Sequence, residues 1–436
     1  MDNKRVAFTT LGCKVNQYES AALEELFRRR GYAVVDFAKP ADVYVINTCT
    51  VTHLGDRKSR RLIRRAVRTN PRAVVAVTGC YAQTAPGEVL DMEGVDLVLG
   101  AGSRAGIVDL VEKAVKGRKT SAVRDITGCR DFEELPGEAR QGRVRALLKI
   151  QEGCRNFCSY CIVPYARGPL RSRPPESVLA GAGELLARGY KEIVLTGINT
   201  GAYGREPGGK TNLAGLLEKL AALPGLLRLR LSSLEPRDIT PELLQMMALG
   251  PPFCRHLHVP LQSGDDQILK SMGRNYDTGF FRALLAKVRD MLPGVGITTD
   301  VMVGFPGETD EHFNNTLSFV EEMRFSGLHV FRYSPRRGTP AAEFPHRVAP
   351  AAMEERSGRM IDLDRELSRR FAVRYLDQTL EVLVEGFASG EENETLEGFT
   401  DNYVRLFIHG PSGLEGRLVS VRAEEISGTG LKGRII

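Results

Sequence analysis

Three cysteines at positions 154, 158 and 161 are the residues whose types and spacing most clearly indicate chemistry. They lie in the segment Cys154-Arg-Asn-Phe-Cys158-Ser-Tyr-Cys161, directly after an apolar run that predicts a strand. Three thiolates at this spacing can hold three corners of a cubane iron–sulfur cluster and leave the fourth iron open to a small molecule. A tetrahedral zinc site would require a fourth Cys or His nearby, and the next ones are distant in sequence.

Three further cysteines, Cys13, Cys49 and Cys80, are far apart in sequence but share one local context. Each follows a predicted strand, within the segments TTLGC, VINTC and AVTGC. Because the carboxyl ends of parallel strands meet at one edge of a sheet, the three thiols could converge there. The small residues before them would let a bulky inorganic cluster approach the backbone. The alternative is three separate buried thiols that pack as small hydrophobic residues.

The elements that must position the second set of cysteines alternate between strand and helix patterns. Strands are predicted over residues 5–12, 43–51, 73–80 and 95–101, and helices over 20–31 and 103–117, the second with Ser103 as its N-cap. This alternation predicts an α/β domain over residues 1–118, a parallel sheet of the flavodoxin or Rossmann type covered by helices.

Six further strand patterns, with helical segments between them, follow a polar connection. They cover residues 146–154, 192–199, 227–235, 256–264, 296–305 and 327–335. Such a pattern predicts a partial TIM-type (β/α)6 barrel, within a domain over residues 140–370. A helical connector leads to strands interrupted by glycines over 380–387, 403–410 and 416–426, which predict a small antiparallel β-barrel over residues 373–436.

Composition excludes several classes of protein. The chain has 436 residues, of which 42% are hydrophobic and 26% charged, so it is neither disordered nor collagen-like. It has no apolar run of 18 residues and no secretory signal pattern, and we expect a cytoplasmic protein with no membrane partner. Its eight cysteines are then better explained by metal binding or catalysis than by disulfides. We expect Cys129 and Cys254, which belong to neither triplet, to be structural.

The net charge of +6 is unevenly distributed. Residues 376–436 contain eleven acidic and five basic side chains, a balance of −6, so the first 375 residues carry +12. A basic body suggests a nucleic-acid partner, and ordinary scatter of solvated charge is the alternative.

The clearest basic element is the predicted helix over residues 56–70, which carries one stripe of arginines at helical spacing: Arg57, Arg61, Arg64 and Arg68. We expect this stripe to contact an RNA backbone; a solvated helix face is the alternative. Five more arginines are expected to extend the same surface, namely Arg167, Arg171, Arg173, Arg336 and Arg337.

The cysteine segment 154–161 resembles the signature of the radical SAM enzymes, in which an aromatic residue, here Tyr160, precedes the third cysteine. The resemblance implies that this triplet holds a 4Fe-4S cluster whose open iron binds S-adenosylmethionine (SAM). It also implies an external electron donor of the flavodoxin or ferredoxin type. Later strand ends would complete the SAM site, at positions filled here by Thr196, Gly197, Glu235 and Asp300.

With its N-terminal cysteines, the chain resembles the radical SAM methylthiotransferases over essentially its whole length, including a C-terminal domain similar to a TRAM domain. The resemblance implies a second 4Fe-4S cluster on Cys13, Cys49 and Cys80. It implies that one SAM methylates a sulfur held there. A second SAM is cleaved to a radical that removes hydrogen from an unactivated carbon, and that carbon takes up the methylthio group.

Relatives act on isopentenylated adenosine in tRNA, on threonylcarbamoylated adenosine in tRNA, or on an aspartate of a ribosomal protein. The segments at 10–20, 165–178, 195–204 and 333–342 resemble the threonylcarbamoyl branch, the MtaB-type enzymes. We therefore expect methylthiolation at C-2 of N6-threonylcarbamoyladenosine at position 37, with the tRNA anticodon stem-loop as partner. The other two substrates, and an RNA-binding protein with structural zinc sites, are the alternatives. The sequence does not indicate the sulfur donor, and the acidic C-terminal domain either gathers its few cations on one face or serves in packing.

Overall fold

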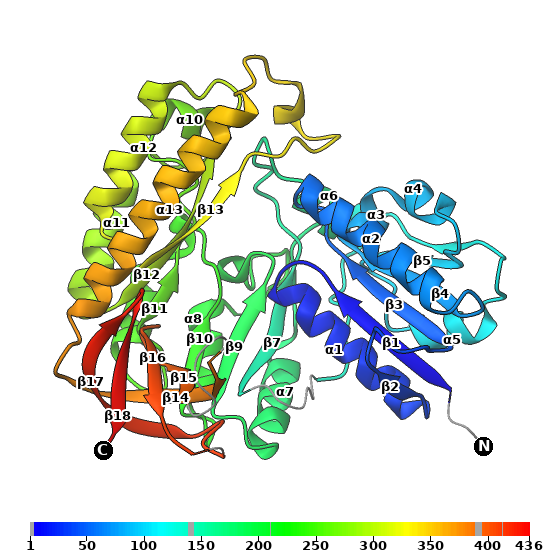
Figure 1. The fold of residues 1–436 in the computed structure, drawn as a ribbon, viewed down its shortest axis with the longest axis horizontal. Helices are drawn as coiled ribbons and strands as arrows, with labels where there is room; N and C mark the ends of the chain where they lie inside the picture. Colours follow the sequence, from blue (N-terminus) through cyan, green and yellow to red (C-terminus); the bar gives the residue numbers. More distant parts are fainter. Residues whose placement is uncertain (1–3, 138–143, 210, 389–394, 412) are drawn as a thin grey trace.

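The N-terminal domain is a parallel six-stranded sheet with helices on both faces (Figure 1). The structure is a computed structural model, and it describes residues 4–137, 144–209, 211–388, 395–411 and 413–436. The sheet order is β2-β1-β3-β4-β5-β6. The strands are β1 (Arg5–Thr10), β2 (Ala33–Val35), β3 (Val43–Thr48), β4 (Val74–Gly79), β5 (Leu97–Leu99) and β6 (Thr120–Ala122). This is the α/β sheet that the sequence predicts.

Helices bury an apolar side on each face of this sheet. They are α1 (Lys14–Arg29), α2 (His53–Thr69), α3 (Cys80–Thr84), α4 (Pro86–Asp91) and α5 (Ile107–Lys113). Phe27 of α1 and Ile107 of α5 pack on one face, and Ile63 of α2 and Tyr81 of α3 pack on the other. Helix α5 is shorter than expected, because the Ser103 hydroxyl donates to the Ala122 carbonyl, 2.9 Å away, and does not cap a helix.

Two strands of the sheet were not expected. β2 and β6 have three residues each, too few to show an alternating pattern. β6 pairs with β5 and lies beyond residue 118, the expected end of the domain. Residue 140, where we expected the second domain to begin, lies outside the described residues.

Six parallel strands form the central partial barrel. They are β7 (Arg145–Glu152), β9 (Glu192–Gly197), β10 (Arg228–Leu231), β11 (His256–His258), β12 (Gly296–Val303) and β13 (Gly327–Arg332). They belong to two sheets, β10-β9-β7-β8 and β11-β12-β13, where β8 (Arg171–Ser172) is antiparallel to β7. A parallel bridge between Leu229 and Phe253 extends the pairing from β10 toward β11. The arrangement is the partial (β/α)6 barrel that the sequence predicts.

All helices of this domain but the first cover the outside of the strands and share one apolar core with them. The helices of the domain are α6 (Val163–Arg167), α7 (Pro175–Ala187), α8 (Leu213–Ala221), α9 (Pro241–Ala248), α10 (Asp266–Ser271), α11 (Thr278–Met291), α12 (Asp310–Met323) and α13 (Pro350–Val373). Within the described ranges, no helix is both long and apolar enough to cross a membrane.

Helix α1 joins the N-terminal domain to the barrel. It packs against β7 and β9 (Figure 1), and Tyr18 forms a small apolar cluster with Leu147 and Val194. The first two turns of α1 therefore lie against the barrel, and its later turns cover the N-terminal sheet.

The C-terminal domain is a closed five-stranded barrel. Its strands are β14 (Thr379–Phe387), β15 (Thr395–Phe399), β16 (Arg405–His409), β17 (Leu418–Ser427) and β18 (Gly430–Ile435), in the order β14-β15-β16-β18-β17. The small antiparallel barrel that the sequence predicts is confirmed, with one parallel pair that was not expected. β18 turns back from β17 and closes the barrel beside β16, to which it is parallel.

Candidate active site

The three N-terminal cysteines converge at the carboxyl edge of the sheet. Cys13 is the N-cap of α1, just after β1, Cys49 directly follows β3, and Cys80 is the first residue of α3, just after β4. β1, β3 and β4 are neighbours, so their ends lie together. A Cβ atom placed on Gly12 would lie 3.3 Å from Cys49 Sγ, which shows how closely the Cys13 loop approaches Cys49.

This triplet has the properties of a cluster-binding set. Burial raises the pKa of Cys49 to about 11 and also raises the pKa of Cys80, and the charges of neighbouring thiolates in the triplet add to both shifts. Thiols that repel one another when ionised need positive charge close by, and iron supplies it. The residues present therefore fit an iron–sulfur cluster.

The second triplet lies in the loop between β7 and α6, at the carboxyl end of the first barrel strand. Burial, together with the charge of Cys158, raises the pKa of Cys154 to about 11 and that of Cys161 to about 12. The structure thus brings these three thiols together, and they fit a second iron–sulfur cluster by the same argument.

A glycine fixes the start of this loop. Gly153 has φ of +78°, and a Cβ atom there would lie 1.8 Å from the Pro169 carbonyl oxygen. No side chain fits that position, so the chain can pass close to residue 169 and present Cys154 at the strand end.

Arg274 supports the loop from the other side and was not anticipated from the sequence. It donates a hydrogen bond to Cys158 Sγ at 3.2 Å and forms an ion pair with Glu235. Burial raises the pKa of Glu235, although Arg274 opposes the shift. Arg274 follows α10, far from the cysteines in sequence, and no spacing pattern connects it to them. Glu235, an expected cofactor residue, therefore reaches the triplet through Arg274.

Tyr160 and Asp300 lie together beside Cys161. All three line one cavity of about 180 Å³ at the barrel end. The Tyr160 ring packs edge-on against Phe305. Thr196 and Gly197, the other expected cofactor residues, end β9; Thr196 is buried, and Gly197 pairs in register with Gln151 of β7. Their roles toward SAM stay predictions.

Asp300 lies between two histidines. It accepts from His258 Nε2 at 3.1 Å and from His329 Nδ1 at 3.2 Å. Burial opposes ionisation, but these hydrogen bonds outweigh it and hold the pKa of Asp300 well below its usual value. The ligand atoms of the three lie within 4.8 Å of one another, and a set of two imidazoles and a carboxylate is also one that binds transition metals.

A buried charge network joins the N-terminal domain to the barrel and reaches one cysteine of the N-terminal triplet. Arg167, at the end of α6, donates to Cys80 Sγ at 3.3 Å and to Glu19 of α1 at 2.6 Å. Lys149 of β7 bonds to Glu19 at 2.8 Å, and Arg104 pairs with the same carboxylate. These side chains are at most 1% exposed, so each charge depends on its partners. Lys149 carried a signal in the sequence, since a lysine inside an apolar strand must be paired.

Most of the additional arginines expected on an RNA surface are buried instead, and that expectation is wrong for four of the five. Arg167 lies in the network, Arg171 donates to the Arg167 carbonyl, Arg173 pairs with Glu134, and Arg336 pairs with Asp56. Only Arg337 of that set is exposed. The sequence pattern did not reveal the partners because they come from distant segments.

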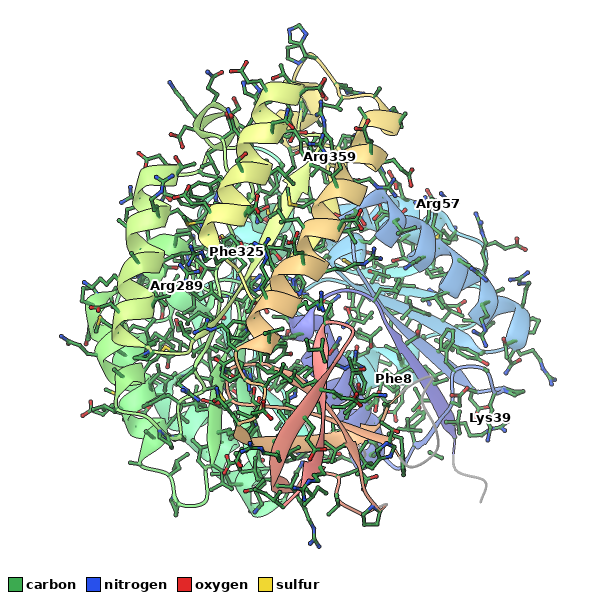
Figure 2. All side chains as sticks on the ribbon, turned by 60° about the vertical axis from the view of Figure 1, so that its left-hand side comes forward. Phe8, Lys39, Arg57, Arg289, Phe325 and Arg359 are labelled. Carbon is green, nitrogen blue, oxygen red and sulfur yellow. The ribbon has the colours of Figure 1, made fainter. Side chains whose placement is uncertain are left out.

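The α2 arginines, in contrast, are exposed. Ile63 and Ala66 are buried on the inner face of α2. Arg57 lies on the outer surface of the domain (Figure 2). Three of the stripe residues line one surface hollow of about 630 Å³, namely Arg61, Arg64 and Arg68. The stripe is therefore available to a phosphate backbone, and its contact with RNA stays a prediction.

The cations of the C-terminal barrel are largely used within that domain. Arg405 pairs with Glu397, and Arg434 bonds to Glu424 at 2.6 Å. The barrel docks on the central domain through Arg230 of β10, whose guanidinium donates to the carbonyls of Thr400 and Asp401. These contacts favour a packing role.

Two family models match the chain. Residues 5–100 match one described as "Uncharacterized protein family UPF0004", and residues 148–320 match the Radical SAM superfamily. Each match contains one cysteine triplet.

Curated relatives extend over nearly the whole chain. It is 47% identical to the threonylcarbamoyladenosine tRNA methylthiotransferase MtaB of Bacillus subtilis, over 96% of this chain and 93% of the relative. It is 37% identical to the enzyme of the same name from Thermotoga maritima, over 98% and 96%. It is also 37% identical to the tRNA-2-methylthio-N(6)-dimethylallyladenosine synthase of Pelotomaculum thermopropionicum, over 96% and 94%.

Solved structures share the fold. The radical S-adenosylmethionine methyltransferase TsrM from Kitasatospora setae superposes with a TM-score of 0.57, covering 78% of this chain and 77% of that one, at 16% identity. This likeness concerns the arrangement of the domains' backbone alone.

Proposed function

Because this chain belongs to the methylthiotransferase family of radical SAM enzymes, we propose that it transfers a methylthio group to C-2 of N6-threonylcarbamoyladenosine at position 37 of tRNA. The observation that carries the proposal is the 47% identity, across nearly the full chain, to a relative named for threonylcarbamoyladenosine in tRNA. The relative named for dimethylallyladenosine is less similar, at 37%. Family membership also makes the chain an enzyme, in place of an RNA-binding protein with structural zinc.

SAM and a 4Fe-4S cluster belong to the reaction of this superfamily. We propose two clusters, one on Cys154, Cys158 and Cys161 and one on Cys13, Cys49 and Cys80. When bound, the first would supply the electron that cleaves SAM, and the second would supply the sulfur that reaches the substrate. Because the cleavage of SAM consumes an electron, we also propose an electron donor of the flavodoxin or ferredoxin type outside this chain, and we propose a cytoplasmic location, where tRNA is modified.

The chain's own residues hold and orient these groups. Arg274 donates to Cys158, and Arg167 donates to Cys80, so each triplet has one guanidinium beside a sulfur. Hydrogen bonds to ligating sulfur fix its orientation and stabilise its negative charge. Tyr160 and Asp300 line the cavity beside Cys161, where we place part of SAM.

The α2 arginines would bind the phosphate backbone of the anticodon stem-loop. Helix α2 follows Cys49 closely in sequence, and its exposed stripe lies on the same domain as the N-terminal triplet. Backbone contacts of this kind position an RNA without reading its sequence.

Nucleoside analysis tests the proposed function. The gene is expressed in a host that forms threonylcarbamoyladenosine but lacks its own methylthiotransferase, and digested tRNA is examined by mass spectrometry. We expect 2-methylthio-N6-threonylcarbamoyladenosine to appear, and to be absent with a Cys158→Ala variant. A methylthio group on isopentenyladenosine instead, or on a ribosomal-protein aspartate, would overturn the substrate assignment.

A further inference from the structure

A cavity of about 270 Å³ lies where the three domains meet. Helix α1 contributes Lys14, the barrel strands contribute Arg145 and Arg230, and the C-terminal domain contributes Glu385 and Tyr403. Lys14 is the residue after Cys13, so the cavity reaches the start of α1, beside the loop that carries the first cysteine of the N-terminal triplet. Neither cysteine triplet lines the cavity, and the proposed chemistry has not used it.

One cation that lines this cavity forms no ion pair with a described residue. Arg145 is paired with Glu385 and donates to the Tyr403 hydroxyl at 3.1 Å, and Arg230 bonds to Glu192 at 2.6 Å. Lys14, by contrast, forms no ion pair or hydrogen bond through its side chain with any residue in the described part of the chain. Its side chain is accessible. The wall therefore presents one ammonium group without an ion pair, which, among the described residues, only the more distant charges of Glu192 and Tyr403 attract.

The rest of the wall is rigid and partly apolar. The Tyr403 ring stacks on His256, with centroids 4.5 Å apart, and the guanidinium of Arg230 lies 4.7 Å from the ring centroid. Surrounding cations hold the pKa of Tyr403 below its usual value, although burial opposes this. Leu147 and Val194 complete the lining. Such a site suits a short chain with an apolar part, hydrogen-bonding groups and one negative charge.

We propose that this cavity binds the N6 substituent of the substrate adenosine, with Lys14 as the specificity-determining residue for its carboxylate. This inference rests on the proposed function. A threonylcarbamoyl group ends in one carboxylate and one hydroxyl, whereas an isopentenyl group has neither. C-2 and C-6 of adenine flank N1, so the substituent extends from the ring while C-2 faces the adjoining Cys13 loop. The one cation of the cavity that forms no ion pair with a described residue matches the single charge of the substituent.

Binding to synthetic RNA tests the assignment independently of turnover. Anaerobically reconstituted full-length protein is titrated with two anticodon stem-loops that differ only at position 37, one with threonylcarbamoyladenosine and one with adenosine. The wild type should prefer the modified RNA. Lys14→Met should lose roughly tenfold affinity for the modified RNA, as expected for a charge-assisted hydrogen bond, and keep its affinity for the unmodified RNA. Lys14→Arg should retain the preference.

Lys39→Met is the matched control, because Lys39 is an exposed lysine of the same domain, away from the cavity (Figure 2). It should behave as wild type. Cluster absorbance checks that Lys14→Met leaves ligation by Cys13 intact. An unchanged preference in Lys14→Met with intact clusters overturns the inference. The proposed function fails on a different observation, the absence of the methylthiolated nucleoside from tRNA.

Discussion

The guanidinium of Arg167 donates a hydrogen bond to the sulfur of Cys80 at 3.3 Å, although Arg167 follows the radical SAM cysteines and Cys80 belongs to the N-terminal sheet. The same guanidinium holds Glu19 and Glu152. One side chain thus joins the helix that follows the radical SAM cysteines to the N-terminal domain, and it places positive charge beside Cys80.

Replacing Arg167 with methionine should weaken the interface between the N-terminal domain and the barrel. The substitution leaves Glu19 and Glu152 buried with fewer partners, a loss that typically costs about 3–5 kcal/mol. We expect a lower apparent unfolding temperature by calorimetry. Loss of the hydrogen bond to sulfur should also lower the reduction potential of the cluster at Cys80, measured by redox titration with electron paramagnetic resonance. The exposed Arg337→Met is the control; equal effects in both variants would contradict the assigned role.

The two triplets should be separable by substitution. Alanine at Cys154, Cys158 and Cys161 should abolish reductive cleavage of SAM, measured as release of 5′-deoxyadenosine. Alanine at Cys13, Cys49 and Cys80 should leave cleavage in place, stop methylthiolation, and remove about half of the bound iron. Product formation by the second variant would refute the second cluster.

Charge reversal on α2 should weaken tRNA binding. Arg61→Glu with Arg64→Glu removes two exposed cations that line the same hollow. Each phosphate contact contributes about 0.9 to the slope of log affinity against log salt, so the slope should become shallower as affinity falls. The control is Lys219→Glu, an exposed lysine on α8. Binding that is indifferent to the α2 reversal at every salt concentration would assign the RNA contact elsewhere.

The docking of the C-terminal barrel should depend on pH through Asp401. Burial opposes its ionisation, but the hydrogen bond from Arg255, at 2.7 Å, lowers the pKa of Asp401 below its usual value. Because the pKa of Asp401 is lower in the folded state, its ionisation stabilises the fold at pH values above about 3.9, the ordinary aspartate pKa. This stabilisation is lost as the pH falls through the pKa of the folded state. Asp401→Asn should therefore be less stable than wild type near neutrality and approach it under acid conditions. Parallel stability curves would contradict this.

The positions of the six triplet cysteines could be predicted because the rule behind them is local. A strand pattern followed by cysteine places a thiol at the carboxyl edge of a parallel sheet. For the three N-terminal thiols to converge, β1, β3 and β4 had only to be neighbours in the sheet, and they are. The charged residues were harder. Arg167 and Arg336 look like surface residues in sequence, and their partners Glu19 and Asp56 lie more than a hundred residues away. Short elements such as β6 carry too little pattern to detect.

Helix α1 has a consequence for how the RNA must enter. Within its first two turns it supplies the lysine of the cavity, a tyrosine against the barrel wall, and the glutamate at the centre of the charge network. Swinging the N-terminal domain aside would strip buried ions of their partners all at once. Movement of the nucleotide costs less free energy than movement of the domain. We therefore expect the target nucleotide to rotate out of its stack and to enter a space between domains that stay fixed.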